Sequence, residues 1–326
     1  MKASTIKKIK IDPTKISLVK NFFGEFGMLL ILFLLMVVLS LIVPKFLSTR
    51  NLVNIAIQNC TVIIVALGIS YVLISGGIDL SLGSVVGMTA ILTCGLTKFY
   101  AFPEWLAILL SLFLSLAIGF VNGWIITRFK LEPVVVTLGT WYIVQGLVQN
   151  FILSRVPTAP TFTTYLGSEK ILGIPIIVLI TLLLILATHL ILSKTILGRW
   201  AYAMGGNPVA ARQSGVPVNR ARIIFFMLSA FYAFVSAILM SGRVFAVDAN
   251  AGSGIVFLAP AAAVVGGTSL FGGRGNAFNA VIGALIMGVI ANGLNLTSVS
   301  FFWQQVAVGA AILVAVTIDA LQRRKE

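Results

Sequence analysis

Few residues of this sequence could do chemistry, and Asp79 is the most conspicuous of them. It lies in "SGGIDLSLGS" (75–84), between two long apolar runs. His189 stands in another apolar run, without the HExxH spacing of a zinc protease. Cys60 and Cys94 form neither a disulfide framework nor a CxxC metal motif. We therefore predict no metal site.

The familiar motifs of catalysis and nucleotide binding are also missing from the sequence. It has no GxxxxGK[ST] phosphate loop, so we predict that this chain binds neither ATP nor another cofactor. It has no GxSxG elbow and no paired carboxylates, which indicates that it is not an enzyme. Ion-driven transporters place ionisable groups inside the membrane, and here such groups are sparse. If the protein transports a solute, we expect its energy source in another polypeptide.

The stretch "GGNPVAARQSG" (205–215) predicts a short, well-capped helix. Asn207 suits the N-cap, and Pro208 suits the first helical position. Gly215 suits the left-handed residue that follows a helix, and Arg212 in the last turn meets the negative end of the helix dipole.

So short a helix is not stable alone in water and needs a surface to pack on. Gly205 and Gly206 predict a turn just before it. Two interpretations remain open at this point. The helix could lie on lipid headgroups, with its arginines at the membrane surface, or it could dock on a cytoplasmic partner.

The composition defines the elements that must position these residues. Of 326 residues, 59% are hydrophobic and only 10% are charged, against about 25% charged in soluble domains. We therefore predict an all-α polytopic membrane protein. About ten segments approach the roughly 20 apolar residues of a membrane span. They are 26–46, 52–75, 82–100, 105–128, 133–154, 174–193, 223–247, 254–271, 276–296 and 299–320.

Charge distribution predicts the orientation of these spans. With ten spans and cytoplasmic termini, seventeen of the 23 Lys and Arg residues lie inside, as the positive-inside rule requires. The net charge of +14 thus reflects membrane orientation, and we predict no nucleic-acid partner. The predicted organisation is a basic cytoplasmic tail (1–25), a transmembrane domain (26–320) with a long cytoplasmic loop (194–222), and a C-terminal tail (321–326).

Two segments within this scheme have unusual composition. At the start of segment 82–100, Asp79 or Ser81 could cap a helix, and the alternative is a role in gating. Segment 254–271 contains Pro260 and many small residues. It predicts either close helix packing or a broken helix that lines a translocation path.

Three stretches together resemble the membrane permease subunits of ribose-type ABC importers. They are "SGGIDLSLGS", "GRWAYAMGGNPVAARQSGVPV", and "AAVVGGTSLFGGRGN" with the later "IGALIMGVIANGLNL". The resemblance extends from about Phe46 to Asp319. One departure is Gln145, where relatives commonly carry Arg, and this puts the exact substrate in doubt.

The resemblance implies partners and roles. It implies a second permease copy, a cytoplasmic ATP-binding subunit that holds ATP and Mg, and an extracytoplasmic sugar-binding protein, all at a cytoplasmic membrane whose lipid surrounds the spans. The expected ATPase-coupling residues are Gly205, Gly206, Asn207, Pro208, Ala210, Ala211, Arg212, Ser214 and Gly215. The expected gating or helix-cap residues are Gly76, Gly77, Asp79, Ser81 and Gly83.

A sugar path needs polar and aromatic side chains among apolar walls. By position, the candidates are Gln58, Asn59, Trp141, Tyr142, Gln145, Asn292 and Asn295. The predicted function is import of ribose or a related monosaccharide. The alternatives are import of autoinducer-2 or another small polar solute by the same machinery, an ion-coupled transporter that works alone, and a membrane scaffold.

Overall fold

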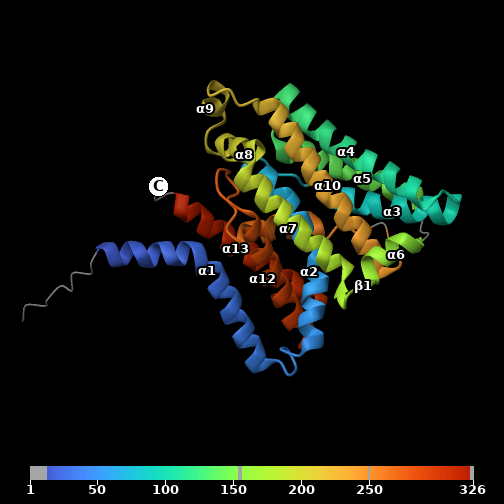
Figure 1. Ribbon diagram of the computed structural model, residues 1–326, viewed down its shortest axis with the longest axis horizontal. Helices are drawn as coiled ribbons and strands as arrows, with labels where there is room; N and C mark the ends of the chain where they lie inside the picture. Colours follow the sequence, from blue (N-terminus) through green and yellow to red (C-terminus); the bar gives the residue numbers. More distant parts are fainter. Residues whose placement is uncertain (1–12, 153–155, 249, 324–326) are drawn as a thin grey trace, which may run out of the picture.

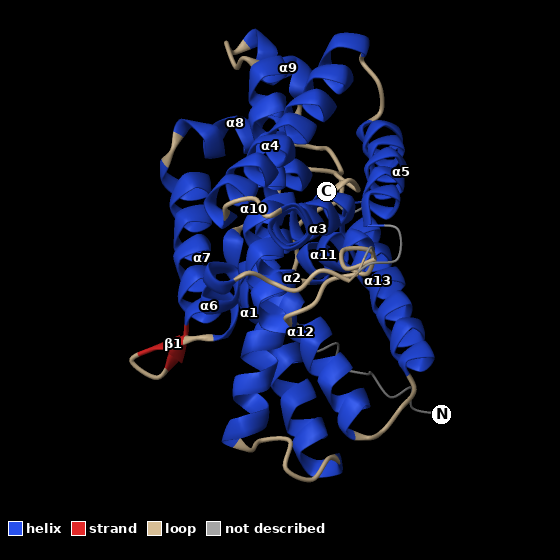
Figure 2. Cartoon of the chain, turned by 90° about the vertical axis from the view of Figure 1, so that its right-hand side faces the viewer, coloured by secondary structure: helices blue, strands red, loops and turns tan. Residues whose placement is uncertain are grey.

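The computed structural model describes residues 13–152, 156–248 and 250–323, and these are almost entirely helical (Figures 1 and 2). The elements are α1 (Pro13–Ile42), α2 (Thr49–Ile74), α3 (Leu82–Tyr100), α4 (Glu104–Phe129), α5 (Pro133–Ile152), α6 (Thr161–Ser168), β1 (Lys170–Ile171), β2 (Ile174–Pro175), α7 (Ile176–Lys194), α8 (Ile196–Gly206), α9 (Pro208–Gln213), α10 (Val218–Val244), α11 (Ile255–Val265), α12 (Ala277–Leu296) and α13 (Phe301–Arg323).

Within the described residues, six helices are long and apolar enough to cross a membrane: α2, α3, α4, α7, α10 and α12. The chain is therefore a multi-pass helical membrane protein. Helix α2 is central, because α7, α10, α11 and α12 all pack against it. From Ile63 to Ile74 its side chains are buried without interruption, which explains an apolar run with no polar face.

The predicted segments between 52 and 247, and those at 276–296 and 299–320, match helices to within a few residues. Helix α1 starts earlier than predicted, at Pro13 instead of residue 26. Part of the predicted tail 1–25 is therefore helical, and residues 1–12 lie outside the described chain. Apolar residues at Ile16, Val19 and Phe23 recur at helical spacing, and this amphipathic pattern extends the helix.

The predicted segment 254–271 is helical over only part of its length. Helix α11 ends at Val265, and eleven residues cover about 16 Å, roughly half of a bilayer core. The chain leaves the helix at Gly266 and Gly267, and Gly267 has a φ of 107° that favours glycine. Pro260 does not break the helix, which continues five residues beyond it.

The two long predicted loops contain regular structure. Residues 155–173 include α6, which begins directly beside the Glu104 carboxylate: Glu104 Oε2 accepts from Phe162 N at 2.9 Å, and Oε1 accepts from Thr163 N at 2.6 Å. The β1–β2 hairpin follows and projects from the molecule (Figure 2). Residues 194–222 contain α8 as well as the predicted α9.

Candidate functional site

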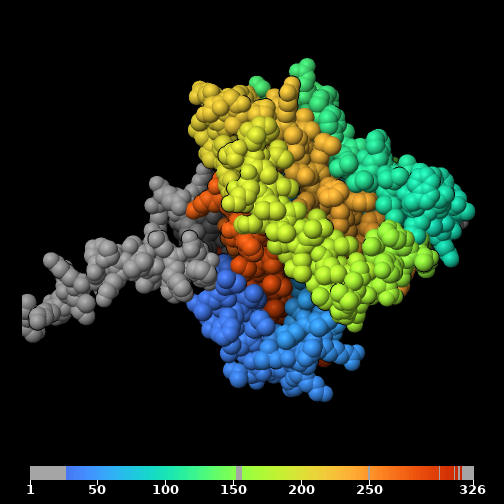
Figure 3. Space-filling view, in the orientation of Figure 1, coloured from blue at the N-terminus to red at the C-terminus, as the bar shows by residue number. Residues whose placement is uncertain are grey.

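Helix α9 forms as its capping residues predict. Asn207 Oδ1 accepts from the backbone N–H groups of Val209 and Ala210, each at 3.0 Å. Pro208 occupies the first helical position, and Gly215 beyond the C-cap has a φ of 85°. The helix is exposed apart from Ala211, and Val209 is 65% exposed. In the space-filling view α8 and α9 form a knob at one end of the molecule (Figure 3).

The predicted turn at Gly205 and Gly206 is wrong, because both residues belong to the last turn of α8. Thr195 caps the start of α8 by accepting from Gly198 N at 3.5 Å. Asn207 then ends α8 and begins α9, with its own N–H bonded to Ala203 O at 3.1 Å. Helix α8 was not predicted because its three glycines are typical of loops as well as of closely packed helices.

Gly205 touches both other family stretches at one point, which we call the glycine junction: Gly76, Gly205, Gly272 and Gly273. A Cβ on Gly205 would collide with the Ile74 carbonyl and with Gly273 N. A Cβ on Gly272 would lie 2.8 Å from the Cα of Gly205 and 3.0 Å from the Cα of Gly76. Three segments distant in sequence are thus in backbone contact, and side chains there would separate them.

Hydrogen bonds hold the glycine junction together. Gly273 N donates to Ile74 O at 2.9 Å, and so joins the loop after α11 to the end of α2. Tyr202 of α8 donates its hydroxyl to Gly275 O at 2.7 Å. Burial raises the pKa of the Tyr202 phenol, so the hydroxyl keeps the proton that it donates. Helix α8 is therefore bonded to the loop that follows α11.

Asp79 lies in the loop that leaves the glycine junction, and it is only 1% exposed. Its Oδ1 accepts from Ser81 N at 3.0 Å and from Ser81 Oγ at 2.6 Å. Ser81 is the N-cap residue of α3, but its side chain makes no capping bond. Neither predicted residue makes a capping bond to the first turn: Ser81 occupies the N-cap position, and Asp79, two residues earlier, bonds to Ser81.

The Asp79–Ser81 pair continues into a polar chain across α4 and α5. Asn122 Nδ2 donates to Ser81 Oγ at 3.0 Å, and Thr140 Oγ1 donates to Asn122 Oδ1 at 2.6 Å. A parallel bond runs from Leu80 N to Thr137 Oγ1 at 3.1 Å. The start of α3 is therefore held against both neighbouring helices.

Sequence reasoning missed Asn122, Thr137 and Thr140. A signal for Asn122 was present, because it is the one amide side chain of a largely apolar helix and lies between Gly119 and Gly123. Both glycines pack against α10, where a Cβ on either would meet backbone atoms. An amide on such a packed face must find a buried partner.

The other predicted gate residues contact different elements. Gly77 donates its N–H to Val72 O at 2.9 Å. Gly83 packs on α11 and the turn before it, where a Cβ would collide with Val256 and lie 2.7 Å from Gly252 O. The stretch 76–83 therefore touches α8, α5 and α11, and Asp79 is only one of its anchors.

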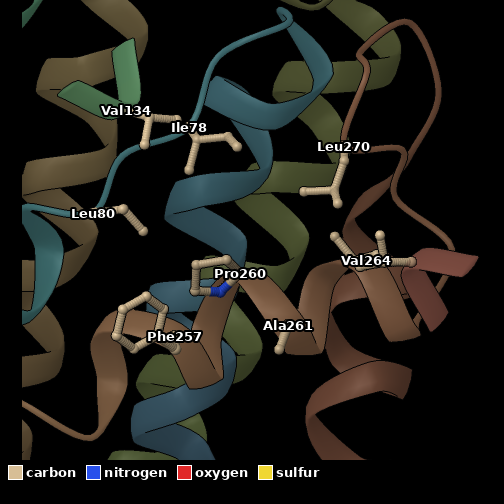
Figure 4. Close-up of a pocket in the computed structure, with 9 residues that line it drawn as sticks. Ile78, Leu80, Val134, Phe257, Pro260, Ala261, Val264 and Leu270 are labelled. Carbon is tan, nitrogen blue, oxygen red and sulfur yellow. The ribbon is translucent and has the colours of Figure 1, made fainter. Parts of the chain in front are cut away.

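An apolar cleft opens beside this stretch (Figure 4). Ile78 and Leu80, which flank Asp79, form one wall, and Pro260 and Phe257 of α11 face them. The rest of the lining is Val134, Ala261, Val264, Leu270 and Val316. The lining of this cleft has no side chain that could form a hydrogen bond with a polyhydroxylated solute. The cleft is therefore suited to excluding a polar solute and not to binding a sugar.

The predicted path residues do not form one cluster. Asn292 of α12 exchanges two amide bonds with Asn51 of α2, at 2.9 and 3.0 Å. Asn59 donates to Ile55 O at 2.7 Å and packs against Gly288. Gln58 and Asn295 are exposed. Asn292 thus joins α12 to α2, Asn59 bonds within α2 and packs on α12, and Gln58 and Asn295 are open to the surroundings.

On α5 the predicted path residues form a separate group. Gln145 Nε2 donates to Asn250 Oδ1 at 3.4 Å, and so reaches the turn before α11. The rings of Trp141 and Tyr142 meet edge to face at 4.6 Å, and Tyr142 is 65% exposed. Trp141 and Gln145 are half-buried one turn apart, whereas Tyr142 shares its exposed side of α5 with Ile143 and Leu147.

The sequence pattern of a family described as "Branched-chain amino acid transport system / permease component" matches residues 51–317. The chain belongs to this permease family. The permease is 35% identical to a ribose import permease of Bacillus subtilis over 299 residues, which are 90% of this chain and 92% of the relative. It is 34% identical to the ribose import permease of Haemophilus influenzae over 88% of this chain and 90% of the relative.

A D-allose transport system permease of Escherichia coli is 31% identical to the permease over 92% of this chain and 93% of the relative. No solved structure matches the chain. The resemblance to ribose-type ABC permeases, inferred from three stretches, is confirmed, and the permease is a transport subunit and not an enzyme. Those three stretches meet at the glycine junction.

Proposed function

We propose that this chain is the permease subunit of a binding-protein-dependent ABC importer for a small sugar, ribose or a related monosaccharide. The sugar class rests on relatives named for ribose and for D-allose. Import of autoinducer-2 or another small polar solute by the same machinery is the second candidate, because Gln145 alters the open side of α5. The ligand of the cognate binding protein distinguishes the two.

The proposed assembly contains two permease copies in the cytoplasmic membrane and an ATP-binding subunit beneath each copy. The ATP-binding subunit, which holds ATP and Mg, docks on α8 and α9, whose exposed Val209 offers an apolar contact. The binding protein docks at the opposite end, near α6 and the β1–β2 hairpin. This arrangement has ten membrane crossings and cytoplasmic termini. Helix α11 and the loop 266–276 together form the eighth crossing.

One observation carries the mechanism: Gly205 of α8 is in backbone contact with the end of α2 and the loop after α11. A movement of α8 driven by ATP would therefore displace both segments. Ile78 lies just after the contact at the end of α2, and Leu270 lies just before the contact in the loop after α11. Both residues line the apolar cleft. We propose that this displacement opens and closes the cleft, while lipid surrounds the outer helix faces.

Exchange of single glycines tests this mechanism. Gly205→Ala places a methyl group into the glycine junction, and overpacking of this kind costs about 1–3 kcal/mol. Gly206→Ala is the matched control, because no atom lies within 4 Å of its Cβ position. Both variants are reconstituted with the ATP-binding subunit and the binding protein, and ATP hydrolysis and sugar uptake are measured together.

We expect Gly205→Ala to take up far less sugar per ATP hydrolysed, while Gly206→Ala matches the wild type. Equal coupling in both variants would exclude the glycine junction as the route of transmission. ATP-independent uptake driven by an ion gradient would instead support a transporter that works alone. Hydrolysis that never responds to sugar-loaded binding protein would support a scaffold.

A further inference from the structure

Two buried polar atoms near the start of α3 have no hydrogen-bond partner: Asp79 Oδ2 and Ser229 Oγ. Ser229 lies on α10, and its hydroxyl is within the reach of the Asp79 carboxyl group. Ser229 is fully buried and Asp79 is 1% exposed. Two buried polar atoms without hydrogen bonds destabilise the fold, unless one of them carries a proton and donates it to the other.

The surroundings of Asp79 offer no countercharge. Asp79 bonds to Ser81, and the polar groups that α4 and α5 bring to its neighbours are Asn122, bonded to Ser81, and Thr137, bonded to Leu80; all three are neutral. Arg222 lies two turns before Ser229 on α10, and its charge interacts with Glu132 and Arg212. Burial is the largest influence on the Asp79 carboxyl, and the side chains that follow it, Ser81 and Ser229, are neutral. An ionised carboxylate without a cation is very costly in a dry interior.

The direction of the polar chain identifies the oxygen that would carry a proton. Asn122 Nδ2 donates to Ser81 Oγ, and Ser81 Oγ donates to Asp79 Oδ1. Ser81 N donates to the same oxygen. Oδ1 therefore accepts two bonds, as the carbonyl oxygen of a carboxylic acid does, and Oδ2 is left for the acid proton.

We propose that Asp79 is a proton-binding site: a neutral carboxylic acid whose Oδ2–H donates to Ser229 Oγ. The acid then bonds the start of α3 to α10 as well as to α4 and α5. Asp79 is a positioning residue in this assignment, and it holds the wall of the apolar cleft in place. Glu104 is the contrast within the same chain, because both of its oxygens accept hydrogen bonds and neither needs a proton.

Infrared spectroscopy tests the proton directly and does not depend on transport. The full chain in lipid nanodiscs at neutral pH should show a carbonyl band of a protonated carboxylic acid. The band should vanish in Asp79→Asn and persist in the control Glu104→Gln. Absence of the band from the wild type, or its persistence in Asp79→Asn, would overturn the proposal whether or not the chain transports sugar.

Rescue by the amide gives a second readout. Asparagine reproduces the acid, because its carbonyl can accept from Ser81 and its Nδ2 can donate to Ser229. We expect Asp79→Asn to retain uptake within about twofold of the wild type, and Asp79→Leu, which leaves these donors unpaired, to lose at least about tenfold. Equal loss in both variants would show that a charge is needed and would contradict the neutral acid.

Discussion

The paired amides of Asn51 and Asn292 show how a single residue can mislead interpretation of a membrane sequence. A polar residue in an apolar helix indicates either a solute contact or a bond between helices. Asn292 was predicted on the sugar path, yet its amide bonds to Asn51, and Asn51 also donates to Phe46 O at 2.9 Å. The structure therefore favours a structural role.

We predict that Asn292→Ala lowers the stability of the permease by about 1–3 kcal/mol, because it leaves Asn51 Oδ1 unpaired. Thermal unfolding in detergent measures this effect, and the exposed Asn295→Ala is the control. A double variant with Asn51→Ala should lose less than the sum of the two single variants. Unchanged melting of Asn292→Ala, with altered sugar stimulation of ATP hydrolysis, would return Asn292 to the path.

Asp79 was recognised from the sequence because a carboxylate between two spans is rare. Its immediate hydrogen bonds to Ser81 are local and follow from its position before a helix. The bonds of its neighbours Ser81 and Leu80 to α4 and α5 depend on which helices pack around α3. No pattern within the stretch 75–84 specifies them, so the polar chain to Asn122 and Thr140 could not be predicted.

Among the elements, α9 was predictable and α8 was not. The caps of α9 are encoded within residues 207–215 and need no tertiary information. Helix α8 contains three glycines, which are typical of loops, although Leu197, Trp200 and Met204 recur at helical spacing and pack on the core. Packing of Gly205 against two distant segments decides its conformation, and only the folded chain provides those segments.

We predict that the N-cap of α9 is needed for coupling. Asn207→Ala removes the acceptor for two backbone N–H groups and should destabilise α9 by about 0.5–2 kcal/mol. The affinity of the ATP-binding subunit for permease nanodiscs should fall, whereas Asn207→Asp, which keeps the cap, should bind like the wild type. Equal affinity for both variants would argue against α9 as the docking element.

At the scale of the whole molecule, orientation is the property that the charge pattern predicts and that labelling can verify. Leu172 in the hairpin is 97% exposed, and Val209 on α9 is 65% exposed. We expect an impermeant maleimide to label Leu172→Cys from outside intact cells, and to label Val209→Cys only in inverted vesicles. Both native cysteines are buried, so the background should be low.

Labelling of Val209→Cys from outside would reverse the proposed orientation. Labelling of both positions from one side would require an even number of crossings between them, in place of the single predicted crossing by α7. In the first case α8 and α9 would face the outside, and in the second case they would lie on the same side as the hairpin. Either result would contradict the proposed docking of the ATP-binding subunit on α8 and α9.

The half-length helix α11 also has a consequence for how the chain is made. Its backbone continues into a non-helical segment whose N–H and carbonyl groups are bonded to Ile74, Tyr202 and residues of its own turn. Lipid cannot supply those partners. Residues 255–276 therefore cannot leave the insertion machinery as an independent span. Their backbone partners on α2 and α8 come earlier in the chain, so we expect this segment to be stable in the membrane only once it packs on them at the glycine junction.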